Sequence, residues 1–192
     1  MKAQGNTRPP HPAPTTQTIY APVTGLEGRT EAELVLNNRS PNSMDVNSTF
    51  YAVEGNSVPG RSVTLRPAEV QHIHLADLIP PSHSGRKKMG GVQLTYFGQV
   101  MEVAAQITLF GRGKAGSVDI PFSASMDYRS NVQEAVWWLP EKGEATIILG
   151  NASNVAVAVN LRYSTGESQD VLLDPLATEV IVRRRDNTSG SP

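Results

Sequence analysis

The stretch that decides the fold is "ELVLNNRSPNSMDVNSTFY", residues 33–51, because "TIILGNASNVAVAVNLRYS", residues 146–164, aligns with it without a gap. Both stretches alternate apolar and polar side chains on either side of an Asn/Ser turn, a pattern typical of half-buried strands. The matching pairs are Leu34/Ile147, Leu36/Leu149, Asn38/Asn151, Ser40/Ser153, Met44/Val157, Val46/Val159, Ser48/Leu161 and Phe50/Tyr163.

The match continues downstream. Leu65-x-Pro67 in "VTLRPAEVQHI" corresponds to Leu173-x-Pro175 in "VLLDPLATEVI", after a shorter intervening hairpin in the second stretch. Any two amphipathic strands around an Asn/Ser turn look alike, so a single matched pair would decide nothing. The ordered series of matches favours a duplicated β unit over that interpretation.

Alternation with a period of two recurs along the chain from Thr18 onwards, and turn-forming clusters of Gly, Pro, Ser and Asn separate the runs. The only segment with helical character is a turn around "LADLI", residues 75–79. Short strands without intervening helices predict an all-β protein, with antiparallel strands arranged in a sandwich.

Residues 101–110 illustrate such a strand, with Val103 and Ile107 on one face and Glu102 on the other. The preceding "YFGQVM" places a Gly-Gln pair between two alternating runs. This pair predicts a two-residue hairpin between neighbouring strands.

Composition excludes several classes of function. The chain has 192 residues, 39% of them hydrophobic, and a formal charge of −1, so no net field attracts nucleic acid or anionic lipid. The absence of cysteine excludes disulfides, zinc–thiolate sites and thiol nucleophiles. No stretch approaches the roughly 18 apolar residues of a membrane span, and no signal peptide is visible at the start.

The strand–turn–strand "L-x-N-x-S" followed by an alternating apolar run resembles the immunoglobulin-like and fibronectin type III-like sandwiches found in tandem in bacterial exported and cell-surface proteins of uncharacterised function. The resemblance covers residues 18–185 and implies an extracellular or cell-envelope location. The cysteine pair and intervening tryptophan of antibody domains are missing, so an antibody-type domain is not indicated.

The predicted organisation has four parts. Residues 1–17 form a disordered leader or linker, residues 18–127 one complete immunoglobulin-like sandwich, residues 132–185 a second, partial copy, and residues 186–192 a disordered tail. Half a sandwich leaves an apolar face and a sheet edge uncovered. Three explanations remain open: a truncated chain, packing of the second copy on the first, or strands supplied by another chain, which would make a homo-oligomer.

"HIHLADL", residues 72–78, raises the question of a metal site. His72 and His74 lie two positions apart and therefore share one face of a strand. Glu69 falls on the opposite face, and His83 lies in a loop. The alternative, a solvated strand face that carries two imidazoles, fits the surrounding alternation better, so no cofactor is predicted.

Trp137 and Trp138 are adjacent in "EAVWWLPEKG" and therefore point to opposite faces of an extended segment. One indole is expected in the core, and the other at the seam between copies or on the surface, where it could stack on a sugar ring. No sequence motif of a hydrolase or a nucleotide-binding loop is present.

The sequence therefore predicts a non-catalytic structural or binding module, an adhesion or scaffold element that contacts a protein or glycan partner through loops or a sheet edge, and not nucleic acid. The predicted contact loops are residues 53–60, 79–91 and 111–116. Two alternatives remain: a carbohydrate-binding module that uses Trp137 or Trp138, and a metal-dependent β-sandwich enzyme centred on His72 and His74.

Overall fold

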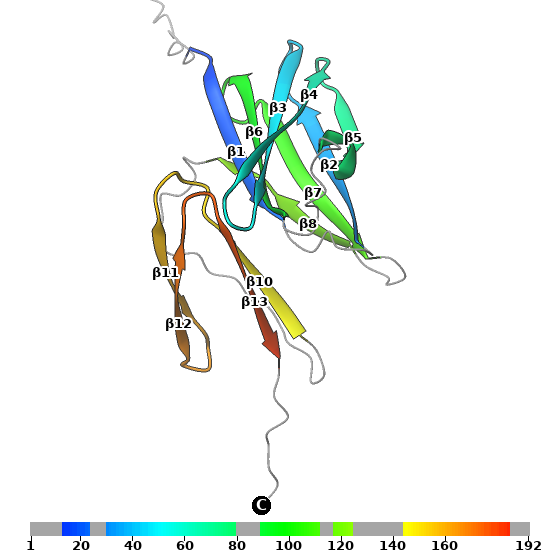
Figure 1. The fold of residues 1–192 in the computed structure, drawn as a ribbon. Helices are drawn as coiled ribbons and strands as arrows, with labels where there is room; N and C mark the ends of the chain where they lie inside the picture. Colours follow the sequence, from blue (N-terminus) through cyan, green and yellow to red (C-terminus); the bar gives the residue numbers. More distant parts are fainter. Residues whose placement is uncertain (1–12, 24–29, 80–88, 112–116, 125–143, 185–192) are drawn as a thin grey trace, which may run out of the picture.

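The computed structural model describes residues 13–23, 30–79, 89–111, 117–124 and 144–184, which form antiparallel strands and one short helix (Figure 1). The predicted all-β class is therefore confirmed. The elements are β1 (Thr15–Pro22), β2 (Thr30–Asn38), β3 (Met44–Ala52), β4 (Ser57–Leu65), β5 (Val70–His74), α1 (Leu75–Leu78), β6 (Met89–Gly98), β7 (Val103–Gly111), β8 (Ser117–Pro121), β9 (Ser123–Ala124), β10 (Glu144–Gly150), β11 (Val157–Arg162), β12 (Ser168–Leu173) and β13 (Thr178–Arg184).

Strands β1 to β9 make up the first unit, which consists of two facing sheets. One sheet has the strand order β4-β3-β6-β1-β9, and the other has the order β5-β2-β7-β8. The hydrophobic core lies between these sheets and is closed at one edge by α1, from which Leu75 and Leu78 are buried. The largest fully buried apolar side chains are Val23, Leu34, Leu36, Val46, Leu65, Leu75, Val92, Leu94 and Ile107.

Strand β3 shows why the alternating sequence folds in this way. Met44, Val46 and Phe50 are buried, whereas Asp45 and Asn47 between them are exposed. Successive strand residues point to opposite faces, so the apolar set lies on the side of the second sheet. The same rule buries Leu34 and Leu36 of β2 from the opposite side.

The β2–β3 turn carries the chain from one sheet to the other, and Asn38 holds it in place. The Asn38 side chain is fully buried, and its Nδ2 donates hydrogen bonds to three carbonyl oxygens, those of Asn42, Leu65 and Arg66. Its Oδ1 accepts a hydrogen bond from the Ser40 backbone N–H at 2.9 Å. One amide thus satisfies several backbone groups that are buried away from water.

The predicted hairpin at Gly98-Gln99 is wrong. Strand β6 pairs with β1 and β3, while β7 pairs with β2 and β8 in the opposite sheet. Residues 99–102 therefore cross between sheets, and the residue with positive φ is Met101 (φ 68°), not a glycine. Alternation is the same in a strand that turns back on its neighbour and in one that crosses, so the pattern could not distinguish them.

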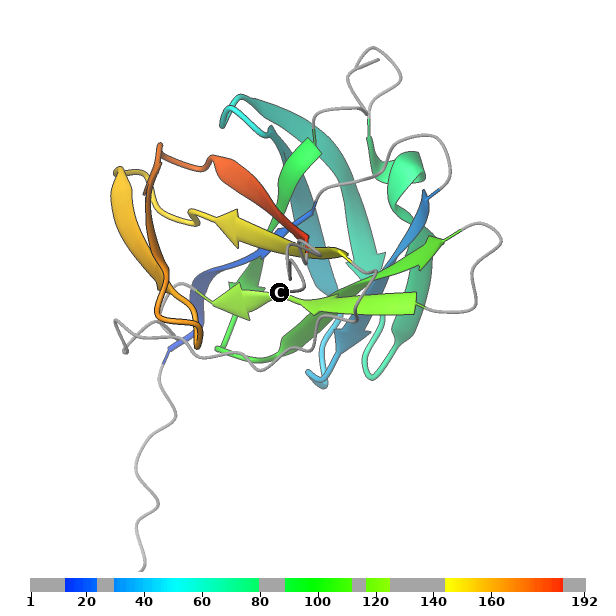
Figure 2. The same ribbon diagram turned by 90° about the horizontal axis from the view of Figure 1, so that it is seen from below.

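Strands β10 to β13 make up the second unit, which lies beside one end of the first (Figures 1 and 2). Strand β10 pairs with β13, and β11 pairs with β12, in two separate layers. The first unit contains the same relation, because β2 pairs with β5 and β3 pairs with β4. Few described side chains of the second unit are buried, namely Asn151, Leu173, Thr178 and Ile181.

The second unit repeats the Asn-centred turn in detail. Nδ2 of Asn151 donates to the carbonyl oxygens of Val155, Leu173 and Asp174, and its Oδ1 accepts from the Ser153 N–H at 2.9 Å. These bonds match the Asn38 contacts one for one. The turn before the returning strand also matches, since Ala68 (φ 56°) and Leu176 (φ 59°) both have left-handed backbones.

The strand boundaries differ slightly from the predicted domain boundaries. Strand β1 begins at Thr15 instead of Thr18, because Thr15 to Gln17 continue the ladder with residues 96–98 of β6. The remaining leader up to residue 12, the end of the predicted sandwich at residues 125–127 and the tail at 186–192 lie outside the described residues. In the part of the chain that is described, no helix has the length and apolarity that a membrane span requires.

Candidate functional site

His72 and His74 lie on the exposed face of β5, as the alternation predicts, and Ile73 between them faces inward. Across the ladder, Glu33 of β2 is the register partner of His74, and its Oε1 lies 3.3 Å from Nδ1 of His72. The structure thus adds a carboxylate to the histidine pair that the sequence analysis did not identify. The alternation within β2 does not predict this contact, because the register between β2 and β5 determines that Glu33 lies beside the two histidines.

Glu69 does not join this group, as its position on the opposite face predicts. Glu69 Oε2 instead accepts a hydrogen bond from the Arg66 N–H in the β4–β5 turn, and His83 lies outside the described residues. No group of three or more His, Asp or Glu side chains within the described ranges is arranged to hold a metal ion. Together, His72, His74 and Glu33 form a solvated polar surface that is able to hydrogen-bond a partner.

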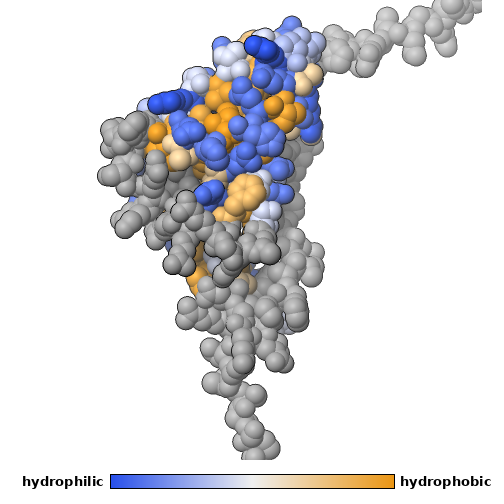
Figure 3. Space-filling view, turned by 90° about the vertical axis from the view of Figure 1, so that its right-hand side faces the viewer, coloured by the Kyte–Doolittle hydropathy of each residue, from blue (hydrophilic) through white to orange (hydrophobic). Residues whose placement is uncertain are grey.

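A polar contact lies next to this surface in the same sheet. Thr108 of β7 is the register partner of Glu33 and is buried, and its Oγ1 donates to Oδ1 of Asp119 in β8 at 2.7 Å. Hydrophobic residues are interspersed with hydrophilic ones on the side of the first unit that carries β5 and α1 (Figure 3). Outward apolar residues of this sheet include Val70 and Phe110.

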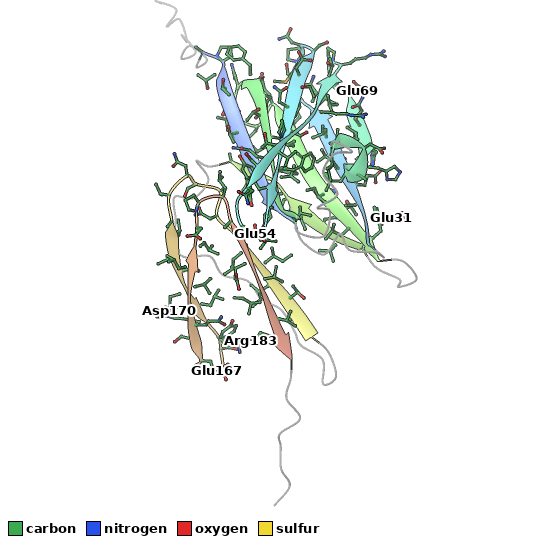
Figure 4. All side chains as sticks on the ribbon, in the orientation of Figure 1. Glu31, Glu54, Glu69, Glu167, Asp170 and Arg183 are labelled. Carbon is green, nitrogen blue, oxygen red and sulfur yellow. The ribbon has the colours of Figure 1, made fainter. Side chains whose placement is uncertain are left out.

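The junction between the units involves one of the predicted contact loops. The Val53 carbonyl in the β3–β4 turn accepts a 3.0 Å hydrogen bond from the Thr178 N–H, and a Cβ added at Gly55 would lie 2.6 Å from the Pro175 oxygen. Figure 4 shows Glu54 of this turn where the second unit meets the first. The expectation that residues 53–60 form a free contact loop is therefore corrected for the turn at 53–55.

A buried hydroxyl pair completes the junction. Thr178 Oγ1 donates to the Gly90 carbonyl at 2.6 Å and lies 3.2 Å from the Tyr20 hydroxyl. Gly150 packs so closely that an added Cβ would lie 2.8 Å from Pro22 Cβ and 2.9 Å from Tyr20 Cε1. These contacts fix the second unit against β1 and β6 of the first.

The opposite end of the first unit lies away from the second unit and is here named the free end. It consists of residues 38–44, 65–70 and 97–102. Figure 4 shows Glu69 at this end, away from the second unit. The connection at the free end exposes large apolar side chains: Phe97 is 68% exposed, Val100 52% and Met101 69%. The hairpin predicted from the Gly-Gln pair in "YFGQVM" falls in this connection.

A shallow pocket of about 170 Å³ opens beside this connection. Most of its lining residues are apolar, and three polar side chains, Gln17, Arg39 and Tyr96, also line it. Burial raises the pKa of the Tyr96 phenol in its wall, backbone hydrogen-bonding groups at Val103 and Met101 lower that pKa in part, and the negative charge of Glu102 raises it. The complete lining is Gln17, Ile19, Arg39, Tyr96, Val100, Met101, Val103, Ala104, Ala105, Phe122 and Ala124.

Several sequence-predicted sites lie outside the described residues. They include both candidate tryptophans, Trp137 and Trp138, and most of the loops predicted at 79–91 and 111–116. The carbohydrate-binding alternative based on the indoles therefore stays a prediction.

Comparisons with known proteins add little. No protein-family model matches the chain, and no curated protein matches it. Among solved structures, the chain is similar to the "Crystal Structure of Thermotoga maritima 1070", with a TM-score of 0.43 and 14% sequence identity, over 56% of this chain and 90% of that chain. Similarity at this level carries no argument about function.

Proposed function

We propose that this protein is a non-catalytic structural and binding module of a bacterial envelope or extracellular protein. It consists of an immunoglobulin-like sandwich followed by a second, partial copy of the same β unit. The matching Asn38 and Asn151 hydrogen-bond sets support the duplication, because the same amide contacts the same turn in each unit. The pairing of β2 with β5 and of β3 with β6 in opposite sheets supports the immunoglobulin-like assignment.

One feature departs from that family pattern. In immunoglobulin-type sandwiches the strand that follows the counterpart of β6 pairs with it, whereas β7 lies in the opposite sheet and pairs with β2 and β8. The proposed relation is therefore one of architecture and duplication, not of detailed strand order.

The observation that carries the proposal is the junction. Tyr20, Gly90 and Thr178 are joined by buried hydrogen bonds, so the second unit is held at a fixed orientation to the first. A sandwich that is rigidly joined to a partial copy, and whose free end exposes apolar side chains, is suited to present that end to a partner.

The test is binding by the full chain. Purified protein, attached to beads through its C-terminus, is applied to arrays of immobilised extracellular proteins and polysaccharides. The proposal predicts saturable retention on protein spots. Retention on no array member, or turnover of a broad panel of ester, glycoside and phosphate substrates, would contradict it.

A further inference from the structure

The connection at the free end, residues 97–102, is held rigidly although its apolar side chains are exposed. Gln99 N–H donates to Oε2 of Glu102 at 2.8 Å, and Glu102 N–H donates to the Gln99 carbonyl at 3.3 Å. The Tyr96 hydroxyl donates to the same Gln99 carbonyl, and the Arg39 N–H donates to the Glu102 carbonyl at 2.7 Å. A loop held in this way loses little further conformational entropy when it binds a partner.

The exposed residues of this loop carry a cost in the unbound protein. Met101 has a left-handed backbone (φ 68°), a conformation that costs a non-glycine residue on the order of 1 kcal/mol. Its side chain and that of Val100 stand at the rim of the pocket and remain largely in water. Burying such side chains against a partner recovers roughly 25 cal/mol per Å² of apolar surface.

The size of the pocket decides what it can hold. Sites for drug-sized molecules and cofactors measure about 300 to 1,000 Å³. The free-end pocket, at about 170 Å³, is smaller than that range and holds a single side chain. Its apolar walls, which include Ile19, Val103 and Phe122, suit an aliphatic group.

The positive charge of Arg39 indicates which group of a binding partner would lie next to the side chain in the pocket. Arg39 lines the pocket, is exposed, and forms no ion pair within the described part of the chain. The nearby Glu102 carboxylate accepts the Gln99 N–H instead. A guanidinium recognises a carboxylate through charge-assisted hydrogen bonds. The second polar group, Gln17, already donates from Nε2 to Thr15 and Gly98, which leaves its Oε1 as an acceptor for a backbone N–H.

We propose that the free-end pocket is the binding site for an extended segment of another protein, which inserts one aliphatic side chain and places an adjacent carboxylate against Arg39. This inference rests on the proposed binding function and names its site and the chemistry of its partner. Val100 and Met101, which line the pocket, pack against the inserted side chain.

The probe is an array of acetylated, amidated hexapeptides that each contain one Leu, Ile or Val next to one Glu or Asp. Matched peptides carry Gln or Asn in place of the acid. The full chain binds the acidic peptides about tenfold more tightly than their amide partners, the difference expected from one charge-assisted hydrogen bond. The Arg39→Gln substitution removes this preference without changing affinity for the amide peptides, as a double-mutant cycle requires.

Two further variants distinguish binding in the pocket from nonspecific electrostatic attraction to this end of the protein. Ala105→Phe fills the pocket and abolishes binding of both peptide sets, while Arg66→Gln, which removes an exposed arginine at the same end, leaves every affinity unchanged. Circular dichroism confirms that each variant is folded. Equal binding of acidic and amide peptides, equal losses from Arg39→Gln and Arg66→Gln, or no binding by the unmodified chain would each overturn the proposal.

The bead assay described under the proposed function shows whether a negative result contradicts the pocket assignment alone or the binding function as well. If Ala105→Phe protein is still retained on the protein array, the binding function stands and the pocket assignment is wrong. If the unmodified chain is retained on no array member and binds no peptide, both proposals are wrong.

Discussion

The two units share a turn but not a core. Asn38 and Asn151 form matching hydrogen bonds and are 0% and 4% exposed, so the local architecture is equally well formed in both units. Around them, the first unit buries a continuous apolar cluster, whereas described residues of the second unit contribute only Leu173 and Ile181 as buried hydrophobic side chains. Hydrogen-bonded turns therefore specify the path of the chain, while the depth of burial is set by how many strands surround it.

One position shows the difference directly. In the first unit, Phe50 is buried in the core. The matching position in the second unit is Tyr163, and the guanidinium Cζ of Arg183 lies 4.2 Å from its ring centroid. Arg183 also approaches Glu167, with 3.6 Å between Nη1 and Oε2, and Figure 4 shows this pair at the far end of the second unit. A partly solvated cation–π contact replaces apolar packing there.

The largest expected difference comes from the same substitution at matching core positions. Leu36→Ala creates a cavity at a fully buried site and lowers the free energy of unfolding by about 3 to 4 kcal/mol. Leu149→Ala, at a half-buried site, costs about 1 kcal/mol. Urea denaturation of both full-length variants, followed by circular dichroism, measures the two losses. Equal losses would mean that the second unit has a core as deep as the first.

The Asn-centred turns give the next largest effect. Asn38→Ala leaves buried carbonyl groups without their donor and lowers the free energy of unfolding by about 2 to 3 kcal/mol. Asn151→Ala has the same chemistry, but fewer buried side chains surround its turn, so we expect about 1 to 2 kcal/mol. Native-state hydrogen exchange reports the losses separately at Ser40 and Ser153, whose N–H groups donate to the two side chains. A larger loss for Asn151→Ala would reverse the comparison.

The junction decides whether the second unit depends on the first. Thr178→Val preserves the shape of the side chain but removes the hydroxyl that contacts Gly90 and Tyr20, at a cost of about 1 to 2 kcal/mol. We expect calorimetry to resolve two transitions in the variant where the unmodified chain shows one. Thr165→Val, an exposed substitution in the β11–β12 turn, serves as the control and leaves a single transition. A single transition in Thr178→Val would show that this hydroxyl does not couple the units.

Alkaline pH should act on the first unit. Burial raises the pKa of Tyr51 and of Tyr96 above the ordinary value of 10.0. The unfolded chain therefore releases these protons first, and stability is complete below pH 10 and falls as the pH rises through the higher folded values. Unfolding free energies measured between pH 8 and 11.5 check the direction, and Tyr51→Phe should reduce the slope. A stability that rises above pH 10 would contradict the prediction.

The smallest expected effect concerns the shared left-handed turn residues. Ala68→Gly relieves an unfavourable backbone conformation at an exposed site and stabilises the chain by about 0.5 kcal/mol, after the entropy of glycine in the unfolded state is subtracted. Leu176→Gly relieves the same conformation but also removes a half-buried side chain, so its net effect is close to zero. Thermal melts compare the two. A clear destabilisation by Ala68→Gly would show that this backbone is not under strain.

The sequence was sufficient for features that depend on local pattern. Alternation located most strands, and "LADL" gave the one short helix. The exposure of His72 and His74 followed from parity within β5. The ordered matches from Leu34 to Tyr163 identified the two stretches whose turns have matching hydrogen bonds.

Features that depend on the placement of distant segments could not be predicted. Glu33 joins His72 through the register of two strands, and Val53 meets Thr178 because two units pack together. The crossing at residues 99–102 was missed because a turn between sheets has the same composition as a hairpin. The free-end pocket was missed for the same reason, since its lining comes from several strands.

Strand β4 forms one edge of its sheet, and its sequence interrupts that edge. Pro59 has no N–H to offer, and the pairing of β3 with β4 shifts register between Asn47 and Thr49. An added Cβ at the neighbouring Gly60 would collide with the Phe50 ring, so the irregularity is packed into place. Copies crowded side by side on a surface are therefore discouraged from joining their sheets into a fibre along β4.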